Sequence, residues 1–281
     1  MIGIIGGTGL YQMDELQVTT VREVTTPFGA PSSPIVVGVL QGRDVAFLAR
    51  HGLNHDLLPS EINYRGNIWA LKGLGVRTIL GVSAVGSLRE EIRPGDLAVP
   101  SQYLDFTRGL RASTFFGRGL VGHVSMANPA CRSTAALIAN AARGLELTLH
   151  ENKTHCVIEG PRFGTRAESL FLRNSGADLV GMTSVPEVFL AAEAQLGYCT
   201  IGVATDYDCW LDDPQHHVSA LEVAKLFRGN LERVQQLLAH VVADYRDDDS
   251  RDCRHTLQGA IMTARERMTA EQRALVSFLT Q

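Results

Sequence analysis

Short apolar runs alternate with segments of helical periodicity along most of the chain, and this alternation constrains the fold more than any other feature. Apolar runs of this length that end in glycine or a small polar residue are typical of buried strands. The predicted strands cover residues 2–5, 35–40, 45–49, 78–82, 97–99, 157–158, 179–182 and 200–204. Strands that alternate with helices indicate an α/β domain built around a central, largely buried sheet.

The helices are predicted from apolar residues that recur three or four positions apart. They cover residues 63–72, 132–143, 167–175 and 187–195. The clearest pattern follows Val218, where Ser219 and Glu222 have the spacing of a capping box. We expect this helix to continue as a single element to near Ala243.

Composition excludes several classes of protein. The 281 residues are 45% hydrophobic and 20% charged, which excludes a disordered chain. The net charge of −4 and the lack of a basic block disfavour a nucleic-acid partner. The uncharged stretch 25–42 contains three prolines and cannot form a membrane helix. The five cysteines are odd in number and widely spaced, which predicts neither a disulfide framework nor a zinc site. We expect a soluble, cytoplasmic protein without a secretory signal.

The chain divides into a predicted domain, residues 1–243, and a C-terminal part, residues 244–281. Residues 244–254 are rich in charge and predict a solvated linker. The apolar residues beyond them are spaced for one or two amphipathic helices. These helices either pack on the same domain or contact another subunit, and both interpretations remain open here.

Glycines follow the first predicted strand in Gly3-Ile-Ile-Gly-Gly-Thr-Gly9. Such a turn can direct successive backbone N–H groups at one anion, and Thr8 adds a hydroxyl. A dinucleotide site is disfavoured because Gln12 replaces the third glycine of the fingerprint, and no Walker lysine is present. A plain tight turn is an equally good interpretation of this motif alone.

Two further strands end in residues that suit an anion. Arg50 and His51 follow the strand 45–49, at the end where open α/β sheets bind ligands. Arginine makes bidentate contacts to phosphate, although a structural salt bridge is the alternative role. Ser83 and the neighbouring amides follow the strand 78–82 and could complete the same anion site.

Asp206 and Asp208 follow the strand 200–204 and are two residues apart, so in an extended segment their carboxylates point the same way. This arrangement suits a ligand with two neighbouring polar atoms. A metal is disfavoured, since the adjacent His216 and His217 point apart and no other cluster has matching spacing. Phe163, in Gly160-Pro-Arg-Phe163, is placed to stack on a planar base or to fill the core.

Together these stretches resemble the 5′-methylthioadenosine phosphorylase family, within the trimeric purine nucleoside phosphorylase superfamily. The resemblance covers residues 1–243 in order, and residues 244–281 match no part of it. It is carried by Ile4-Ile-Gly-Gly-Thr-Gly9, Thr26-Pro-Phe-Gly29, Ala49-Arg-His-Gly52, Asn67-Ile-Trp-Ala-Leu-Lys72, Ile158-Glu-Gly-Pro-Arg-Phe163, Val185-Pro-Glu187 and Thr205-Asp-Tyr-Asp-Cys-Trp210. It implies one mixed α/β domain with a twisted, partly barrel-like central sheet surrounded by helices, and a homotrimer.

The resemblance also implies an activity, the phosphorolysis of 5′-methylthioadenosine to adenine and 5-methylthioribose 1-phosphate. Inorganic phosphate is the co-substrate, and neither a metal nor an organic cofactor is implied. Asp206 would act as general acid toward N7 of the base and Asp208 would accept from its 6-amino group. Phe163 would stack on the base and Met182 would lie against the ribose. The implied phosphate ligands are Thr8, Arg50, His51, Ser83, the amide of Ala84 and Thr183.

The chain departs from the family pattern at the substrate's 5′ end and in the phosphate site. Ser83 stands where threonine is common and keeps the hydroxyl. Ala220 and Ala224 replace larger aliphatic residues of the methylthio pocket, whereas Val223 remains apolar. His123 matches a histidine near the 5′ group, with a purely structural role as the alternative.

Two other functions are weighed against this activity. A phosphorylase for 6-oxopurine nucleosides, such as 5′-methylthioinosine or inosine, usually carries asparagine at the position of Asp206. A nucleoside-binding sensor without turnover would not need both acids and a complete phosphate site. The partners expected are therefore a small nucleoside and phosphate, with neither nucleic acid nor membrane.

Overall fold

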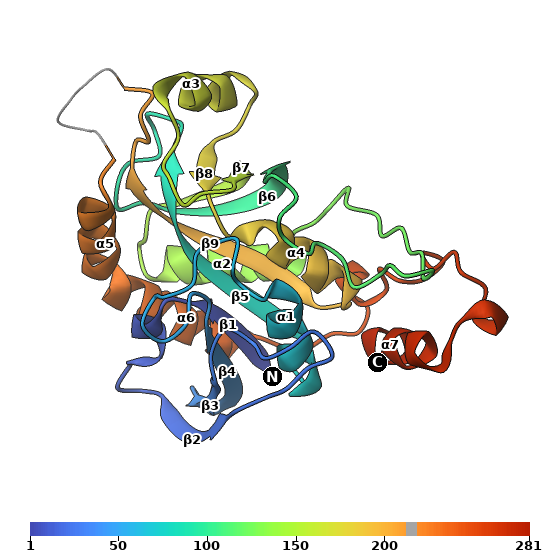
Figure 1. Cartoon of the computed structure of the whole chain (residues 1–281). Coiled ribbons are helices and arrows are strands. Elements are labelled where there is room, and N and C mark those ends of the chain that lie inside the picture. Colours follow the sequence, from blue (N-terminus) through green and yellow to red (C-terminus); the bar gives the residue numbers. More distant parts are fainter. Residues whose placement is uncertain (212–217) are drawn as a thin grey trace.

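A central sheet with helices on both faces makes up most of the computed structural model, which describes residues 1–211 and 218–281, Thr8 by its backbone alone (Figure 1). The strands are β1 (Ile2–Gly6), β2 (Gln17–Arg22), β3 (Ile35–Leu40), β4 (Arg43–Ala49), β5 (Thr78–Ser87), β6 (Leu97–Phe106), β7 (Leu149–Ile158), β8 (Leu179–Gly181) and β9 (Gly197–Asp206). The helices are α1 (Tyr64–Gly73), α2 (Arg132–Gly144), α3 (Arg166–Asn174), α4 (Ser184–Glu193), α5 (Ala220–Gly229), α6 (Leu231–Asp244) and α7 (Ala270–Leu279). Short 3₁₀ helices are η1 (Thr8–Tyr11), η3 (Asp252–Arg254) and η4 (Arg265–Arg267).

The sheet is mixed and partly closed. Its strand order among the described residues is β2-β3-β4-β1-β5-β8-β7-β6-β9, and β9 also pairs with β5. This last pairing closes β5, β8, β7, β6 and β9 into a barrel-like ring. Strand β1 runs parallel to both β4 and β5, and β5 runs parallel to β9. The predicted mixed, partly barrel-like α/β fold is confirmed.

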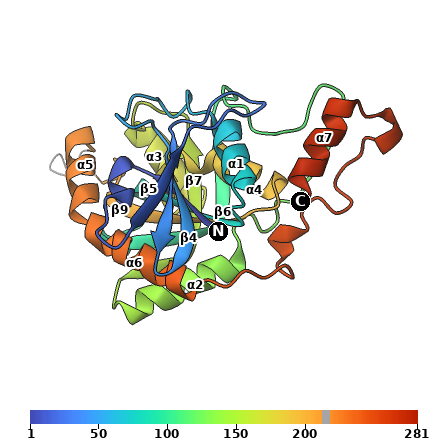
Figure 2. The same ribbon diagram turned by 90° about the horizontal axis from the view of Figure 1, so that it is seen from below.

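Each face of the sheet has its own layer of helices, because successive residues of a strand point to opposite faces. Ile4 of β1 belongs to a buried cluster with Ile138 of α2 and Leu237 of α6. Ile5, the next residue, belongs to a second cluster with Ile68 of α1 and Leu190 of α4. Figure 2 shows the two layers, with α2 and α6 on one side and α1 and α4 on the other.

All eight predicted strands are present, and β2 is the strand that the sequence pattern missed. It lies at the edge of the sheet, and nearly all of its residues are exposed. An edge strand of this kind carries no apolar run, so apolar patterning cannot reveal it.

The single helix predicted from Ser219 to near Ala243 is wrong, since the structure divides this segment into α5 and α6. Ser219 does cap the start, and its Oγ accepts from the Glu222 N–H at 3.2 Å. The break falls at Asn230, whose backbone leaves the helical region and whose Nδ2 donates to the Leu226 carbonyl at 2.9 Å. Gly229 and Asn230 have low helix propensity, and this bond competes with the helical ladder.

The C-terminal part folds back onto the domain. Residues 246–250 are exposed, as expected for a solvated linker, but Tyr245 and Arg254 on either side are buried. Farther on, Phe278 of α7 stacks on Trp69 of α1, with ring centroids 3.8 Å apart. The amphipathic helix is therefore packed on its own domain, the first of the two interpretations left open by the sequence.

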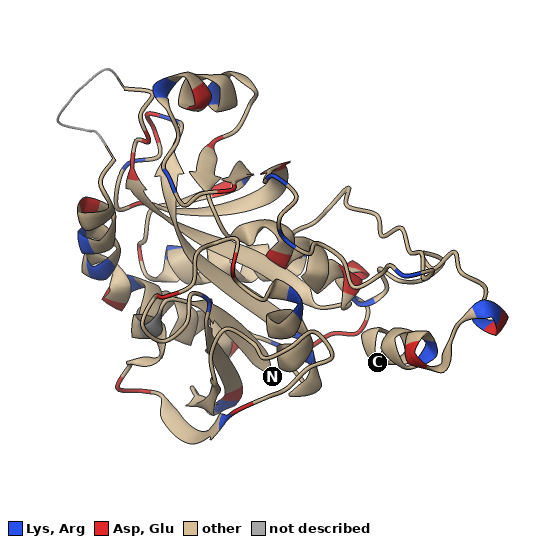
Figure 3. Cartoon of the chain, viewed as in Figure 1, with Lys and Arg blue, Asp and Glu red and all other residues tan. Residues whose placement is uncertain are grey.

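Two further features concern the apolarity of the helices and the distribution of charge. In residues 1–211 and 218–281, no helix has both the length and the apolarity needed to cross a bilayer. Lysine and arginine are interspersed with aspartate and glutamate along the ribbon (Figure 3).

Candidate active site

Three parallel strands bring the predicted anion ligands to one edge of the sheet. The backbone N–H of Arg50, just after β4, donates to the Gly6 carbonyl at the end of β1 at 2.9 Å. Ser83 lies in β5, which is longer than β1 and β4 and extends past their ends. The carboxyl ends of parallel strands meet in this way at one edge, where open α/β sheets bind ligands.

Arg50 is buried and forms an ion pair with Glu187 of α4. Its Nε and Nη2 each donate to one carboxylate oxygen of Glu187 at 2.8 Å. Glu187 also accepts from the hydroxyl of Tyr198, in β9, at 2.7 Å. Burial opposes the charge of Arg50, but Glu187 overcomes that penalty and holds the pKa of Arg50 above its ordinary value. The structural salt bridge considered from the sequence is therefore present.

The remaining donors of Arg50 connect it to neighbouring strands. Nη1 donates to the Val82 carbonyl at 2.8 Å and to Ser83 Oγ at 3.2 Å, and Nη2 makes a longer contact of 3.4 Å to the Ile5 carbonyl. Ser83 Oγ lies 3.2 Å from Thr183 Oγ1 at the start of α4. All five N–H donors of Arg50 are engaged, and the two longest bonds are the ones that an anion oxygen can most easily replace.

His51 is close to the ion pair but is neutral. Its Nδ1 lies 2.8 Å from the Leu57 carbonyl, and its ring stacks on His55 at 4.4 Å. Burial lowers the pKa of His51 to about 4, and the charge of Arg50 adds to the lowering. Because a carbonyl only accepts, Nδ1 carries the proton and Nε2 is left as an acceptor. Neutral His51 can therefore accept a hydrogen bond from a protonated oxygen of an anion.

The two acids are neighbours, but through a turn and not through strand alternation. Asp206 ends β9, and its carboxylate accepts from Thr205 Oγ1 at 2.7 Å and from the Asp208 N–H at 2.8 Å. Asp208 has a φ of 51°, so the extended segment assumed from the sequence is wrong at this residue. Aspartate tolerates this conformation better than most residues. A Cβ at Gly86 would lie 3.0 Å from Asp206 Oδ1 and 3.3 Å from Asp208 Cβ.

Burial is the main influence on both carboxyl groups. It raises the pKa of Asp206, and the nearby charge of Asp208 raises it further, against the hydrogen bonds from Thr205 and the Asp208 amide. Burial likewise raises the pKa of Asp208. A carboxyl group with a raised pKa is better able to carry a proton at neutral pH and to transfer it.

The Gly160–Gly164 loop lies beside the acids. Cys209 Sγ donates to the Gly164 carbonyl at 3.2 Å, which joins the loop to the residue after Asp208. Phe163 is 38% exposed, so it is available for stacking and is not a core residue. A Cβ at Gly160 would lie only 2.6 Å from Met182 Sδ, which places Met182 against the other end of the loop.

Arg111 holds these parts in place, and the sequence pattern did not reveal it. Its Nη1 donates to the carbonyls of Met182 at 2.6 Å and Val185 at 2.8 Å. Its Nε and Nη2 bond to the side chain and backbone carbonyl of Glu159, at 2.9 and 2.7 Å. These partners are 48 to 74 residues away in sequence, so no local motif marks Arg111. Glu187 did carry a signal, because a carboxylate within a buried apolar helix must be paired.

Three other predicted site residues lie in different parts of the fold. The backbone N–H of His123 donates to the Ala260 carbonyl at 2.9 Å, in the loop that runs beside the C-terminal part, away from α3 and α5 (Figure 1). Val223 is half-buried on α5, which packs beside β9. Ala84 of β5 pairs with Val203 of β9.

Some residues considered from the sequence fall outside the described part of the chain. They are the side chain of Thr8 and the whole of His216 and His217. Among the residues that the structure does describe, no group of three or more His, Cys, Asp or Glu is arranged to hold a metal ion.

The sequence of this chain is similar to the sequences of known phosphorylases. A family model described as the phosphorylase superfamily matches residues 1–243. The chain is 47% identical over 261 residues to the S-methyl-5′-thioadenosine phosphorylase of Thermofilum pendens, covering 93% of this chain and 98% of the relative. It is 43% identical over 279 residues to that of Geobacter sulfurreducens, covering 99% and 97%.

Solved structures show the same similarity. A methylthioadenosine phosphorylase from an Antarctic soil metagenomic library has a TM-score of 0.92 and 44% identity, over 99% of this chain and 98% of that one. A mutant adenosine/methylthioadenosine phosphorylase from Schistosoma mansoni, in complex with adenine, has a TM-score of 0.88 and 37% identity, over 94% and 99%.

The ion pair predicts a large difference between two glutamate variants. Glu187→Ala leaves the buried charge of Arg50 unpaired and should lower the free energy of unfolding by about 3–5 kcal/mol. Glu151 pairs with Arg143 on the surface, both side chains being largely exposed, and Glu151→Ala should cost at most about 1 kcal/mol. Urea denaturation of both variants measures the difference. Equal losses would show that the buried pair does not stabilise the site.

Proposed function

The chain belongs to the phosphorylase superfamily, and we propose that it catalyses phosphorolysis of 5′-methylthioadenosine to adenine and 5-methylthioribose 1-phosphate. The observation that carries this proposal is the position of two acids, Asp206 half-buried and Asp208 buried, beside the predicted anion ligands at one edge of the sheet. Asp206 lies over Gly86 of β5, the strand that also holds Ser83. The named relatives and the solved structures of the family give the same activity.

Phosphate is both nucleophile and electrostatic stabiliser in this reaction. A phosphate oxygen forms a bond to C1′ of the ribose as the bond from C1′ to N9 of the base breaks. Positive charge develops on the sugar in the transition state, and the phosphate dianion stabilises it. The hydroxyls of Ser83 and Thr183 donate hydrogen bonds to the phosphate. Nε2 of neutral His51 accepts a hydrogen bond from the protonated oxygen of HPO₄²⁻. Arg50 can turn the N–H donors that now bond to Ser83 Oγ and to the Ile5 carbonyl toward the phosphate.

The acids act on the leaving base. Asp206, whose pKa is raised by burial, transfers a proton to N7 of adenine as the bond to the sugar breaks. Asp208 accepts a hydrogen bond from the 6-amino group, which favours adenine over 6-oxopurines. Phe163 stacks on the base, and Met182 lies against the ribose. Since the phosphate provides the negative charge and Asp206 the proton, the reaction needs neither a metal nor an organic cofactor.

The assembly belongs to the same proposal. His123 is held beside the C-terminal part by the bond from its backbone N–H to the Ala260 carbonyl. We infer that His123 contacts the 5′ group of a substrate bound to a neighbouring copy in a homotrimer. Val223 of that neighbouring copy contacts the same 5′ group from its other side. The cytoplasm is the proposed location, which the five free cysteines support.

The activity is tested by a substrate panel with and without phosphate. We expect base release from 5′-methylthioadenosine only with phosphate, and slower release from adenosine and 5′-methylthioinosine. Ser83→Ala removes one hydroxyl and should raise the phosphate KM about tenfold. Arg50→Ala should raise the phosphate KM further, and it also leaves Glu187 unpaired. Glu151→Ala, which removes a charged side chain from the surface, is the control and should leave the phosphate KM unchanged. Base release that is independent of phosphate would refute a phosphorylase.

The two acids predict separable effects. Asp206→Asn keeps a hydrogen-bond donor but cannot release a proton, so turnover should fall about 10²–10⁴-fold. Asp208→Asn can donate to O6, so it should reduce the preference for 6-amino over 6-oxo bases, a mismatch worth up to about 10⁴–10⁵-fold. The measurement is kcat/KM for 5′-methylthioadenosine and 5′-methylthioinosine. Near-parental turnover in Asp206→Asn, or an unchanged preference in Asp208→Asn, would contradict the roles.

The shared site predicts complementation between two impaired variants. His123→Ala and Asp206→Asn each impair every site in a trimer of one kind. In trimers assembled from a mixture, some sites combine an intact His123 with an intact Asp206, and activity should rise above the sum of the two variants. Light scattering identifies the oligomer. An active monomer at assay concentration, or a mixture without added activity, would rule out the shared site.

A further inference from the structure

Two cysteines that are 122 residues apart in sequence lie in contact outside the active site. Cys131 is the N-cap residue of α2, and Cys253 lies in η3 of the C-terminal part. Their sulfur atoms are 3.4 Å apart, and the thiol of Cys253 donates to Cys131. The proposed phosphorolysis uses neither residue, so the pair calls for an explanation of its own.

The surroundings of Cys131 favour its thiolate. Thr134 Oγ1 donates to its sulfur at 3.2 Å, and Ser133 Oγ lies 3.3 Å away. The bond from Cys253 is the main cause that lowers the pKa of Cys131, and the hydroxyls of Ser133 and Thr134 add to it against burial. The N-terminus of a helix favours negative charge as well. The same pairing raises the pKa of Cys253.

A cavity of about 550 Å³ gives access to the pair. Its lining includes both cysteines, Pro129, Arg251 and the apolar Leu196. This volume lies in the range that proteins use for small-molecule ligands. Cys131 is itself only 6% exposed, so a reagent reaches its sulfur through this cavity and not from an open surface.

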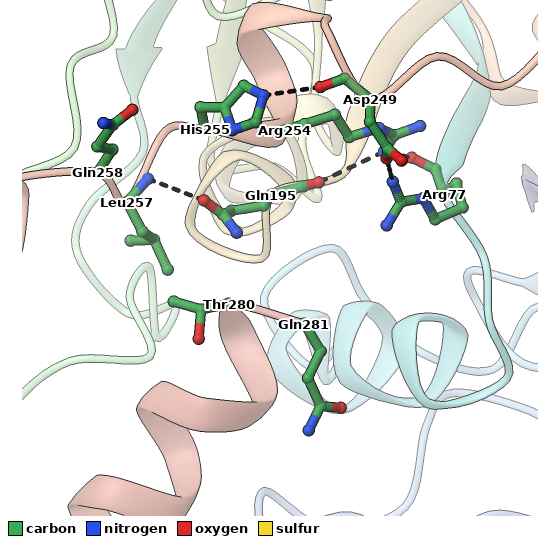
Figure 4. A pocket seen from close by; sticks show the side chains of 9 residues that line it. All are labelled: Arg77, Gln195, Asp249, Arg254, His255, Leu257, Gln258, Thr280 and Gln281. Atoms are coloured by element: carbon green, nitrogen blue, oxygen red, sulfur yellow. Dashed lines mark hydrogen bonds and ion pairs between the residues drawn. The ribbon is translucent and has the colours of Figure 1, made fainter.

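The neighbouring cavity, of about 630 Å³, differs in chemistry (Figure 4). Arg77 and Asp249 of its lining form an ion pair, and the lining contains no thiol. Burial raises the pKa of Cys156 and Cys199, so neither is a ready nucleophile. Among the described residues, the combination of paired thiols and an adjoining cavity is found at Cys131 and Cys253.

We propose that Cys131 and Cys253 form a thiol–disulfide exchange site for a low-molecular-weight disulfide, with Cys131 as nucleophile and Cys253 as resolving residue. The Cys131 thiol loses its proton to solvent, and its sulfur attacks one sulfur of the disulfide. A mixed disulfide forms, and the first small thiolate leaves and is protonated. Cys253 then loses its proton and attacks Cys131 Sγ, and the second small thiol leaves. Two protein thiols are oxidised and one small disulfide is reduced to two thiols.

The resulting bond would link α2 to the C-terminal part. That part already contacts the end of α4, where Thr256 Oγ1 donates to the Ala192 carbonyl at 2.6 Å. A covalent link that closes so long a loop restricts the unfolded chain. We therefore expect the oxidised protein to melt about 5 °C higher than the reduced protein.

The experiment treats the full-length protein with oxidised glutathione and maps its cysteine peptides by mass spectrometry. The parent protein should yield a peptide joining Cys131 to Cys253, with the loss of two hydrogens. Cys253→Ser cannot resolve the intermediate and should accumulate glutathione on Cys131. Cys131→Ser should form neither product. Cys209→Ser, which changes a cysteine outside the pair, should react as the parent does.

Several results would overturn the proposal. One is a parent protein that carries glutathione but no bond between the two cysteines. Another is a Cys253→Ser variant whose glutathione is attached elsewhere than Cys131. Oxidised protein that melts no higher than reduced protein would refute the link to stability. Cys131→Ser and Cys253→Ser should retain parental phosphorolysis, which separates this proposal from the catalytic one.

Discussion

The buried ion pair of Arg50 and Glu187 is the interaction on which the rest of the site depends. An isolated charge cannot remain in such an interior, so each partner requires the other. Arg50 follows β4, Glu187 lies in α4, and Tyr198 of β9 donates to the same carboxylate. Further bonds from Arg50 reach β5 and the carbonyl of Ile5 in β1. One pair therefore fixes four strand segments and a helix relative to one another.

The pair also sets the electrostatics of the site. Glu187 pairs with the charge of Arg50, and burial keeps His51 uncharged. The proposed phosphate site therefore offers the hydroxyls of Ser83 and Thr183 together with N–H donors of the paired Arg50. The acid end is the opposite case, since burial raises the pKa of Asp206 and favours the protonated form. This arrangement suits two substrates, an anion bound at one end of the site and a nucleoside whose leaving base needs a proton at the other.

Apolar patterning predicts the sheet well because buried strands need continuous apolar residues. The strand ends then locate Arg50 and Asp206, whereas Ser83 lies within β5, which continues past the predicted end to Ser87. Contacts over long sequence distances are not predictable in this way. Arg111 binds carbonyls 71 and 74 residues away and carries no local mark. The turn at Asp208 replaces the expected extended segment. Edge strand β2 and the helix break at Asn230 also depend on contacts that the pattern of apolar residues does not reveal.

The proposed reaction joins phosphate to the sugar as the base departs. Phosphorus NMR of a reaction containing the enzyme, 5′-methylthioadenosine and inorganic phosphate tests it most directly. We expect that one phosphate is consumed for each adenine released and that a single sugar 1-phosphate ester appears. Adenine released with free 5-methylthioribose, while the phosphate signal stays constant, would contradict it.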